Sequence, residues 1–188
     1  MLLNNFRRVL VNTISKYLNL SQTMGMTGEI KSTGGTVYNS SSMDYPQIIG
    51  LKSNCNICTS GTNYDSTDIP IGNFAFTGCQ IYLGTGNVTP TIDDYKLSGE
   101  LVTGLTSQSQ NTSATNNSIT FSAIATNNTD APVTIKEIGL GGYYNSPDCA
   151  FLLTRDVLTT PVTLNTGDSK TFSITIDFRS LTDTTVNE

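Results

Sequence analysis

The sequence predicts an all-β fold, an antiparallel β-sandwich of jelly-roll or immunoglobulin-like type with an N-terminal amphipathic α-helix. Three observations predict it. Charged residues make up only 13% of the 188 residues, and Thr, Ser, Asn and Gly take their place. This composition is poor in helix formers and rich in turn formers. Short β-branched and aromatic runs recur between turn signals from residue 74 onward, whereas residues 2–18 show helical periodicity.

The helical stretch at the N-terminus has one apolar face. Apolar side chains recur at spacings of three and four, and Arg7, Arg8 and Lys16 fall on the opposite side. The stretch lacks the unbroken apolar core and small-residue cleavage site of a signal peptide, and its arginines exclude a membrane span. Three placements remain open, namely packing on its own domain, docking into a partner or a second copy, or lying on a membrane surface. We favour docking, through a face made of Phe6, Val9, Leu10, Ile14 and Tyr17.

Composition divides the chain into three parts. Residues 1–20 form the amphipathic helix, which we interpret as an assembly arm. Residues 21–73 are rich in Gly, Ser and Thr and form a linker with early strands. Residues 74–188 form the β-sandwich domain. We expect this domain to fold without the arm.

The domain opens with a strand and a corner. The strand that contains Ile81 ends at the glycine corner Gly84–Gly86, and a single helical turn follows Pro90. Thr91 is placed to cap that turn, and Asp94 stands where the acid of a capping box belongs. A dinucleotide-binding loop would need a third glycine at the start of a long helix, which the sequence lacks here.

Later elements follow from alternation and turn signals. Residues 104–117 are polar and of low complexity, so we expect a long exposed loop or a mobile flap. Residues 118–125 alternate as a half-buried strand does. The next strand, residues 133–140, shifts phase at Lys136 and Glu137, which predicts a β-bulge. Two more strands are predicted at residues 151–158 and 171–178.

Charge and composition exclude several functions. Residues 1–28 carry three basic residues and no acid, so the remaining 7 basic and 15 acidic residues give the body a net charge of −8. Such a body repels phosphate backbones, and we expect no nucleic-acid binding by it. Histidine is absent, which removes the commonest general base and most metal sites. We therefore expect no enzymatic activity, no cofactor and no metal.

The four cysteines leave three interpretations. Cys55 and Cys58 have the spacing of a zinc knuckle or a redox motif, but no second such pair follows, and Cys79 and Cys149 stand alone. A zinc site made of all four thiolates and a disulfide pair are both open. Reduced, partly buried thiols that are dispensable for folding are the interpretation we favour.

Two pairs of charged residues have plain structural interpretations. Glu137 and Arg155 fall on strands that we expect to be neighbours, so the sequence predicts a salt bridge across the sheet. A ligand-binding Arg155 is the alternative. Asp93 and Asp94 are interpreted as partners of a helical turn, because the sequence holds no Asp-rich calcium loop.

Several short motifs occur in a fixed order. They are "NNFRRVL" at the N-terminus, "LGTG" at 83–86, "PTIDDYKL" at 90–97, "IKEIGL" at 135–140, "LLTR" at 152–155 and the strand "TFSITIDF". In this order the chain resembles small virion structural proteins of tailed bacteriophages. The resemblance implies a tail, neck or capsid-associated protein that is assembled in the bacterial cytoplasm with other virion proteins and as a homo-oligomer. It carries over no catalytic residues, and Cys55 and Cys58 lie outside its pattern.

A second class of function also fits the sequence. The polar loops are compatible with a carbohydrate- or cell-surface-binding β-sandwich module. Carbohydrate sites usually present aromatic side chains on an exposed face, however, and the sequence has no Trp and only scattered Tyr. We therefore expect a virion structural role, with the surface-binding module as the alternative.

Overall fold

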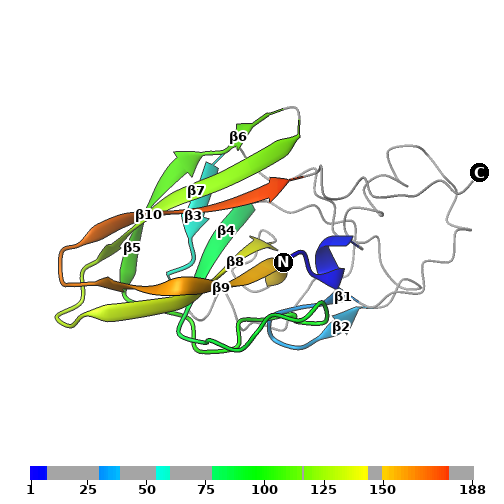
Figure 1. Cartoon of the computed structure of the whole chain (residues 1–188), viewed down its shortest axis with the longest axis horizontal. Helices are drawn as coiled ribbons and strands as arrows, with labels where there is room; N and C mark the ends of the chain where they lie inside the picture. Colours follow the sequence, from blue (N-terminus) through cyan, green and yellow to red (C-terminus); the bar gives the residue numbers. More distant parts are fainter. Residues whose placement is uncertain (8–29, 39–53, 60–77, 116, 144–149, 178–188) are drawn as a thin grey trace, which may run out of the picture.

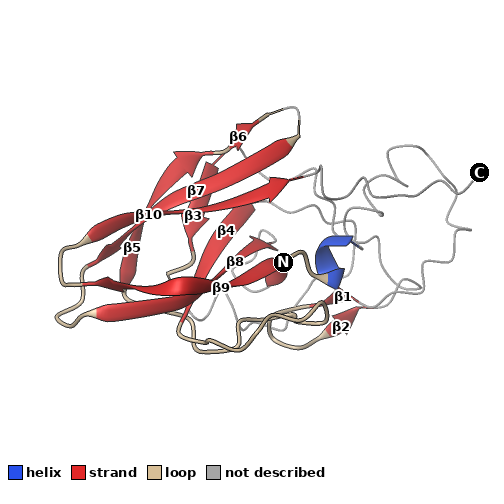
Figure 2. Cartoon of the chain, viewed as in Figure 1, coloured by secondary structure: helices blue, strands red, loops and turns tan. Residues whose placement is uncertain are grey.

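The computed structural model describes residues 1–7, 30–38, 54–59, 78–115, 117–143 and 150–177 (Figure 1). Strands dominate these ranges (Figure 2), and the prediction of a mostly β fold is confirmed. The strands are β1 Ile30–Lys31, β2 Val37–Tyr38, β3 Asn54–Ile57, β4 Gly78–Gly84, β5 Leu105–Asn111, β6 Ser113–Ala114, β7 Ser118–Asn127, β8 Val133–Tyr143, β9 Ala150–Leu164 and β10 Ser169–Asp177.

One curled sheet contains most of the strands. Its order is β10-β7-β5-β3-β4-β8-β9, with β6 paired to β7, while β1 and β2 form a separate hairpin. The sheet is mixed, because β3 and β4 run parallel and its other strand pairs are antiparallel. Among the described strands, β3 is the link between the half that holds β10, β7 and β5 and the half that holds β4, β8 and β9.

The main core lies on the inner face of the curled sheet. Alternation buries every second residue of β7 and β10, as the sequence predicts for strands with one apolar face. Side chains from both halves of the sheet join in a single cluster. Its largest members are Phe6, Ile57, Ile81, Leu83, Leu105, Phe121, Ile135, Ile138, Leu140, Phe151, Leu153, Leu164, Phe172, Ile174 and Ile176.

A smaller apolar cluster covers the outer face of β4, β8 and β9. It consists of Leu3, Cys58, Tyr82, Leu97 and Leu152. The residue on β8 opposite this cluster must be small, because a Cβ on Gly141 would lie 2.2 Å from the Tyr82 ring. Glycine at this position therefore lets the Tyr82 ring pack directly against the sheet backbone.

The N-terminal residues belong to this fold. Residues 1–3 run antiparallel to β9, with backbone hydrogen bonds from Leu3 N to Leu153 O and from Arg155 N to Met1 O. The first described helical residues are 4–7, so the predicted helix does not include residues 2 and 3. The prediction of a helix over residues 1–20 is therefore wrong for residues 1–3. These residues are extended because they pair with the outer edge of β9. Residues 8–20 lie outside the described part of the chain.

Two other predictions are corrected and one is confirmed. Residues 104–117 contain β5 and β6 rather than only a loop, because the backbone of these polar residues pairs with β7 and β3. The segment from Thr91 to Asp94 is a hydrogen-bonded turn and not a helical turn. The bulge is confirmed, since the β8–β9 register shifts between Ile135 and Glu137.

Candidate functional site

One carboxylate holds the corner loop, residues 85–101, against the outer face of the sheet. Glu137 on β8 is fully buried. Its oxygens accept hydrogen bonds from the backbone N–H groups of Gly86, Ser98 and Gly99 at 3.0, 3.0 and 2.8 Å. The backbone at Gly86 and the backbone at Gly99 lie too close together for a side chain between them, because a Cβ on Gly99 would lie 2.3 Å from the Gly86 nitrogen. The glycines of the predicted corner therefore allow the loop backbone to come close enough to hydrogen bond to a buried carboxylate.

Arg155 on β9 completes this network. Its Nε donates to Glu137 at 2.8 Å, which confirms the predicted salt bridge. Its other two nitrogens donate to Asp94 and to the backbone oxygen of Val88. Asp94 in turn accepts from the backbone N–H of Thr91, as the acid of the predicted cap would, but the Thr91 hydroxyl donates to Asp94 instead of accepting a backbone N–H. Because all three guanidinium nitrogens have protein acceptors, the network has the character of a structural clamp rather than a ligand site.

The electrostatics of the clamp favour its ionised form. Burial by itself raises the pKa of Glu137, but hydrogen bonds from Ser98 and Gly99 and the charge of Arg155 outweigh burial and hold that pKa below its ordinary value. The same competition between burial and the contacts of Thr91 and Arg155 lowers the pKa of Asp94. The partner carboxylates likewise raise the pKa of Arg155 despite its burial.

Acid is therefore expected to destabilise the fold through this clamp. A carboxyl whose pKa is depressed on folding contributes stability that is complete above its unfolded pKa and is lost as the pH falls through its folded pKa. For Glu137 and Asp94 the loss begins below about pH 4.5. Urea unfolding between pH 7 and pH 3 measures it, and Glu137→Gln should show a shallower decline in this range than the wild type. An equal decline in both proteins would contradict the assignment.

The predicted docking face is only partly within the described residues. Phe6 is 3% exposed and packs in the main core of its own chain, so this side chain is not available to a partner. The expectation that Phe6 docks elsewhere is corrected, because the inner face of the sheet already buries its ring. The other four residues of that face, Val9, Leu10, Ile14 and Tyr17, lie outside the described residues.

The cysteines within the described ranges are buried. Cys55 and Cys79 lie in the main core, and Cys58 lies in the outer cluster. Cys149 falls outside the described ranges. Among the described residues, no three His, Cys, Asp or Glu side chains come together as ligands of a metal would.

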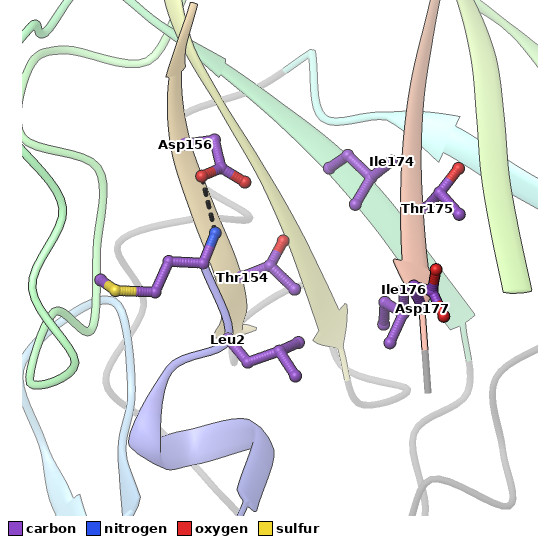
Figure 3. Close-up of a pocket in the computed structure, with 8 residues that line it drawn as sticks. Leu2, Thr154, Asp156, Ile174, Thr175, Ile176 and Asp177 are labelled. Carbon is purple, nitrogen blue, oxygen red and sulfur yellow. Dashed lines mark hydrogen bonds and ion pairs between the residues drawn. The ribbon is translucent and has the colours of Figure 1, made fainter. Parts of the chain in front are cut away.

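A small groove separates β9 from β10, the two ends of the strand order. It encloses about 260 Å³ and is lined by Met1, Leu2, Thr154, Asp156 and the last four residues of β10 (Figure 3). The N-terminal residues fill the outer edge of β9 here, and the Met1 amino group forms an ion pair with Asp156 at 2.6 Å. The groove thus shows how the N-terminus covers a strand edge.

The broadest candidate for binding is the outer face of β5, β7 and β10. Its outward side chains on β7 and β10 pair across the strands through hydroxyl groups, Thr120 with Thr175 and Ser122 with Ser173 at 2.8 Å, and Thr126 with Ser169 at 2.7 Å. We call this surface the hydroxyl face. It comprises Thr106, Gln108, Thr120, Ser122, Ile124, Thr126, Ser169, Thr171, Ser173 and Thr175.

Sequence reasoning missed this face. The alternation of Ser and Thr with apolar residues in β7 and β10 indicated two strands, but it did not show that those strands are neighbours. Their register places three pairs of hydroxyl residues opposite one another and Thr171 opposite Ile124, and β5 extends the face with Thr106 and Gln108. The signal that could have revealed it is the matching period of polar residues in residues 118–127 and 169–177.

Comparisons with known proteins assign no function to these surfaces. The chain matches no protein-family model, no curated protein and no solved structure. In the part that the structure describes, no helix has the length and apolar character required to cross a bilayer.

Proposed function

We propose that this protein is a non-catalytic structural component of a tailed-bacteriophage virion, tail, neck or capsid-associated. It is built into the particle with other virion proteins and with copies of itself. The ordered motifs that resemble small virion proteins support this proposal, and the hydroxyl face is the structural observation that carries it. In this proposal the two halves of the curled sheet act as the two layers of a sandwich, with the β10-β7-β5 layer turned toward a neighbouring subunit.

The chemistry of the hydroxyl face suits burial against protein. On β7 between Thr120 and Thr126, and on β10 between Ser169 and Thr175, every outward side chain is uncharged. Burying charged groups is costly unless they are paired. Hydroxyl groups that already hydrogen bond to one another have a smaller desolvation cost when they leave water. The cross-strand pairs also hold the hydroxyls in a fixed array, which lowers the entropy lost on association.

The arm keeps a role in this proposal. Residues 1–7 anchor it to the sheet. Val9, Leu10, Ile14 and Tyr17 remain the predicted face for contact with a partner. Anchoring at one end would direct this face from a fixed point on the domain, so the arm and the hydroxyl face can engage neighbouring subunits together.

A charge placed in the hydroxyl face is expected to block assembly and leave the fold intact. Ser122→Lys and Ser122→Glu put an unpaired charge at the centre of the face, while exposed substitutions usually change stability by less than about 0.5 kcal/mol. Thr159→Lys and Thr159→Glu, at an exposed position of β9, are the matched controls. Each variant is expressed during infection, and its amount in purified particles is measured relative to the wild type.

The expected result is loss of both Ser122 variants from particles, with the Thr159 variants incorporated normally. Incorporation of the Ser122 variants at the wild-type ratio would show that this face is not an assembly surface. Absence of the wild-type protein from particles would contradict the virion role itself. Binding of the isolated protein to a glycan array, lost in the Ser122 variants, would favour the surface-binding alternative.

A further inference from the structure

Two buried cysteines face each other across the parallel strand pair. Cys55 on β3 is directly opposite Cys79 on β4, and both belong to the main core, with 0% and 1% of their surface exposed. Neighbouring strands lie about 4.8 Å apart, which is within the α-carbon separation of about 4.4–6.8 Å that a disulfide spans. Cys58 is buried in the other cluster, beside Tyr82 on the outer face. The C-x-x-C spacing that stands out in the sequence is therefore not the pair that the fold brings together.

The two thiols also interact with each other. The hydrogen bond that Cys55 makes with Cys79, together with burial, raises the pKa of Cys55. The same hydrogen bond lowers the pKa of Cys79. Cys79 is thus the more readily deprotonated of the two thiols, and the deprotonated form is the nucleophile of disulfide exchange.

We propose that Cys55 and Cys79 are a redox-convertible pair that forms a cross-strand disulfide when the protein meets a small-molecule disulfide such as oxidised glutathione. The Cys79 thiolate attacks one glutathione sulfur, forms a mixed disulfide and releases the first glutathione thiol. Cys55 then loses its proton and attacks the Cys79 sulfur, which releases the second. Two protein thiols are oxidised to one disulfide, and one glutathione disulfide is reduced to two thiols.

The position of this pair determines what the bond would do. β3 is four residues long, and among the described strands it is the link between the β5 and β4 sides of the curled sheet. It is joined to β5 through two residue pairs and to β4 through three. A disulfide here would fasten the junction covalently, while local opening of so short a strand provides the access that exchange needs. The inference goes beyond the proposed function and does not depend on it.

Peptide mapping under non-reducing conditions tests the pairing. The purified full chain is incubated with oxidised glutathione in its native state, and a second sample is refolded from urea in a glutathione redox buffer so that access to the thiols is not limiting. Remaining thiols are alkylated before digestion. We expect a peptide pair that links Cys55 to Cys79, with Cys58 alkylated. The melting temperature should rise on oxidation and return to its starting value with reductant.

Two variants make the result specific. Cys58→Ala should form the same cross-link and show the same rise in melting temperature, whereas Cys55→Ala should show neither. The peptide map of the wild-type protein identifies the linked cysteines without the variants. Failure of a variant to fold would therefore not weaken the test. A link from Cys55 to Cys58 or Cys149, or alkylation of Cys55 and Cys79 in both wild-type samples, would overturn the inference.

Discussion

Replacement of Arg155 with methionine is expected to lower the free energy of unfolding by about 3–5 kcal/mol, the usual cost of breaking a buried ion pair from one side. The arginine side chain is 2% exposed and Glu137 is completely buried, so the variant leaves a carboxylate charge in the interior without a cationic partner, held only by backbone N–H groups and the Ser98 hydroxyl. Asp94 and the Val88 carbonyl lose their donor as well. Urea unfolding at pH 7 measures the loss, and Lys136→Met, at a partly exposed neighbour, is the control.

A second substitution separates the cost of the charge from that of lost packing. Glu137→Gln in the Arg155→Met background removes the unpaired charge, while its amide oxygen can still accept from the backbone of the corner loop. The double variant should therefore be more stable than Arg155→Met alone, which a double-mutant cycle reports directly. If Arg155→Met unfolds at the wild-type urea concentration, the clamp does not stabilise the sheet as we infer.

Removal of residues 1–7 is expected to remove most or all of the free energy of unfolding of the domain. Truncation of a buried Leu to Ala costs about 2–5 kcal/mol and that of a buried Phe about 3–5 kcal/mol, against a total of about 5–15 kcal/mol for a typical domain. The deletion removes Leu3 and Phe6 and also the strand pairing along β9. This outcome is opposite to the independent folding that the sequence suggested, because the structure places these residues in the core.

Single substitutions test the same point with less disruption. Phe6→Ala should lower the melting temperature strongly, whereas Arg7→Ala, at an exposed neighbour, should leave it nearly unchanged. Circular dichroism follows both variants and the deletion. A deleted protein that melts at the wild-type temperature would restore the view that the N-terminus is only an assembly arm.

Local patterns in the sequence were sufficient for part of this fold. Alternation along residues 118–125 and 171–178 predicted two of the strands, observed as β7 and β10, because burial of one sheet face leaves a period of two. The phase shift at Glu137 predicted the bulge, since an extra residue reverses that period. Glu137 and Arg155 could be paired because their strands follow one another along the chain and are joined antiparallel.

Other features were decided by tertiary structure alone. β5 has a polar sequence without apolar alternation, and it is a strand only because β7 and β3 satisfy its backbone. Likewise, the periodicity of the N-terminus indicated a helix, but the free edge of β9 draws residues 1–3 into strand pairing. The facing of Cys55 and Cys79 requires the parallel register of β3 and β4. Such pairings join residues that are far apart in the chain. The local sequence around a strand does not determine which other strand will pair with it in the folded sheet.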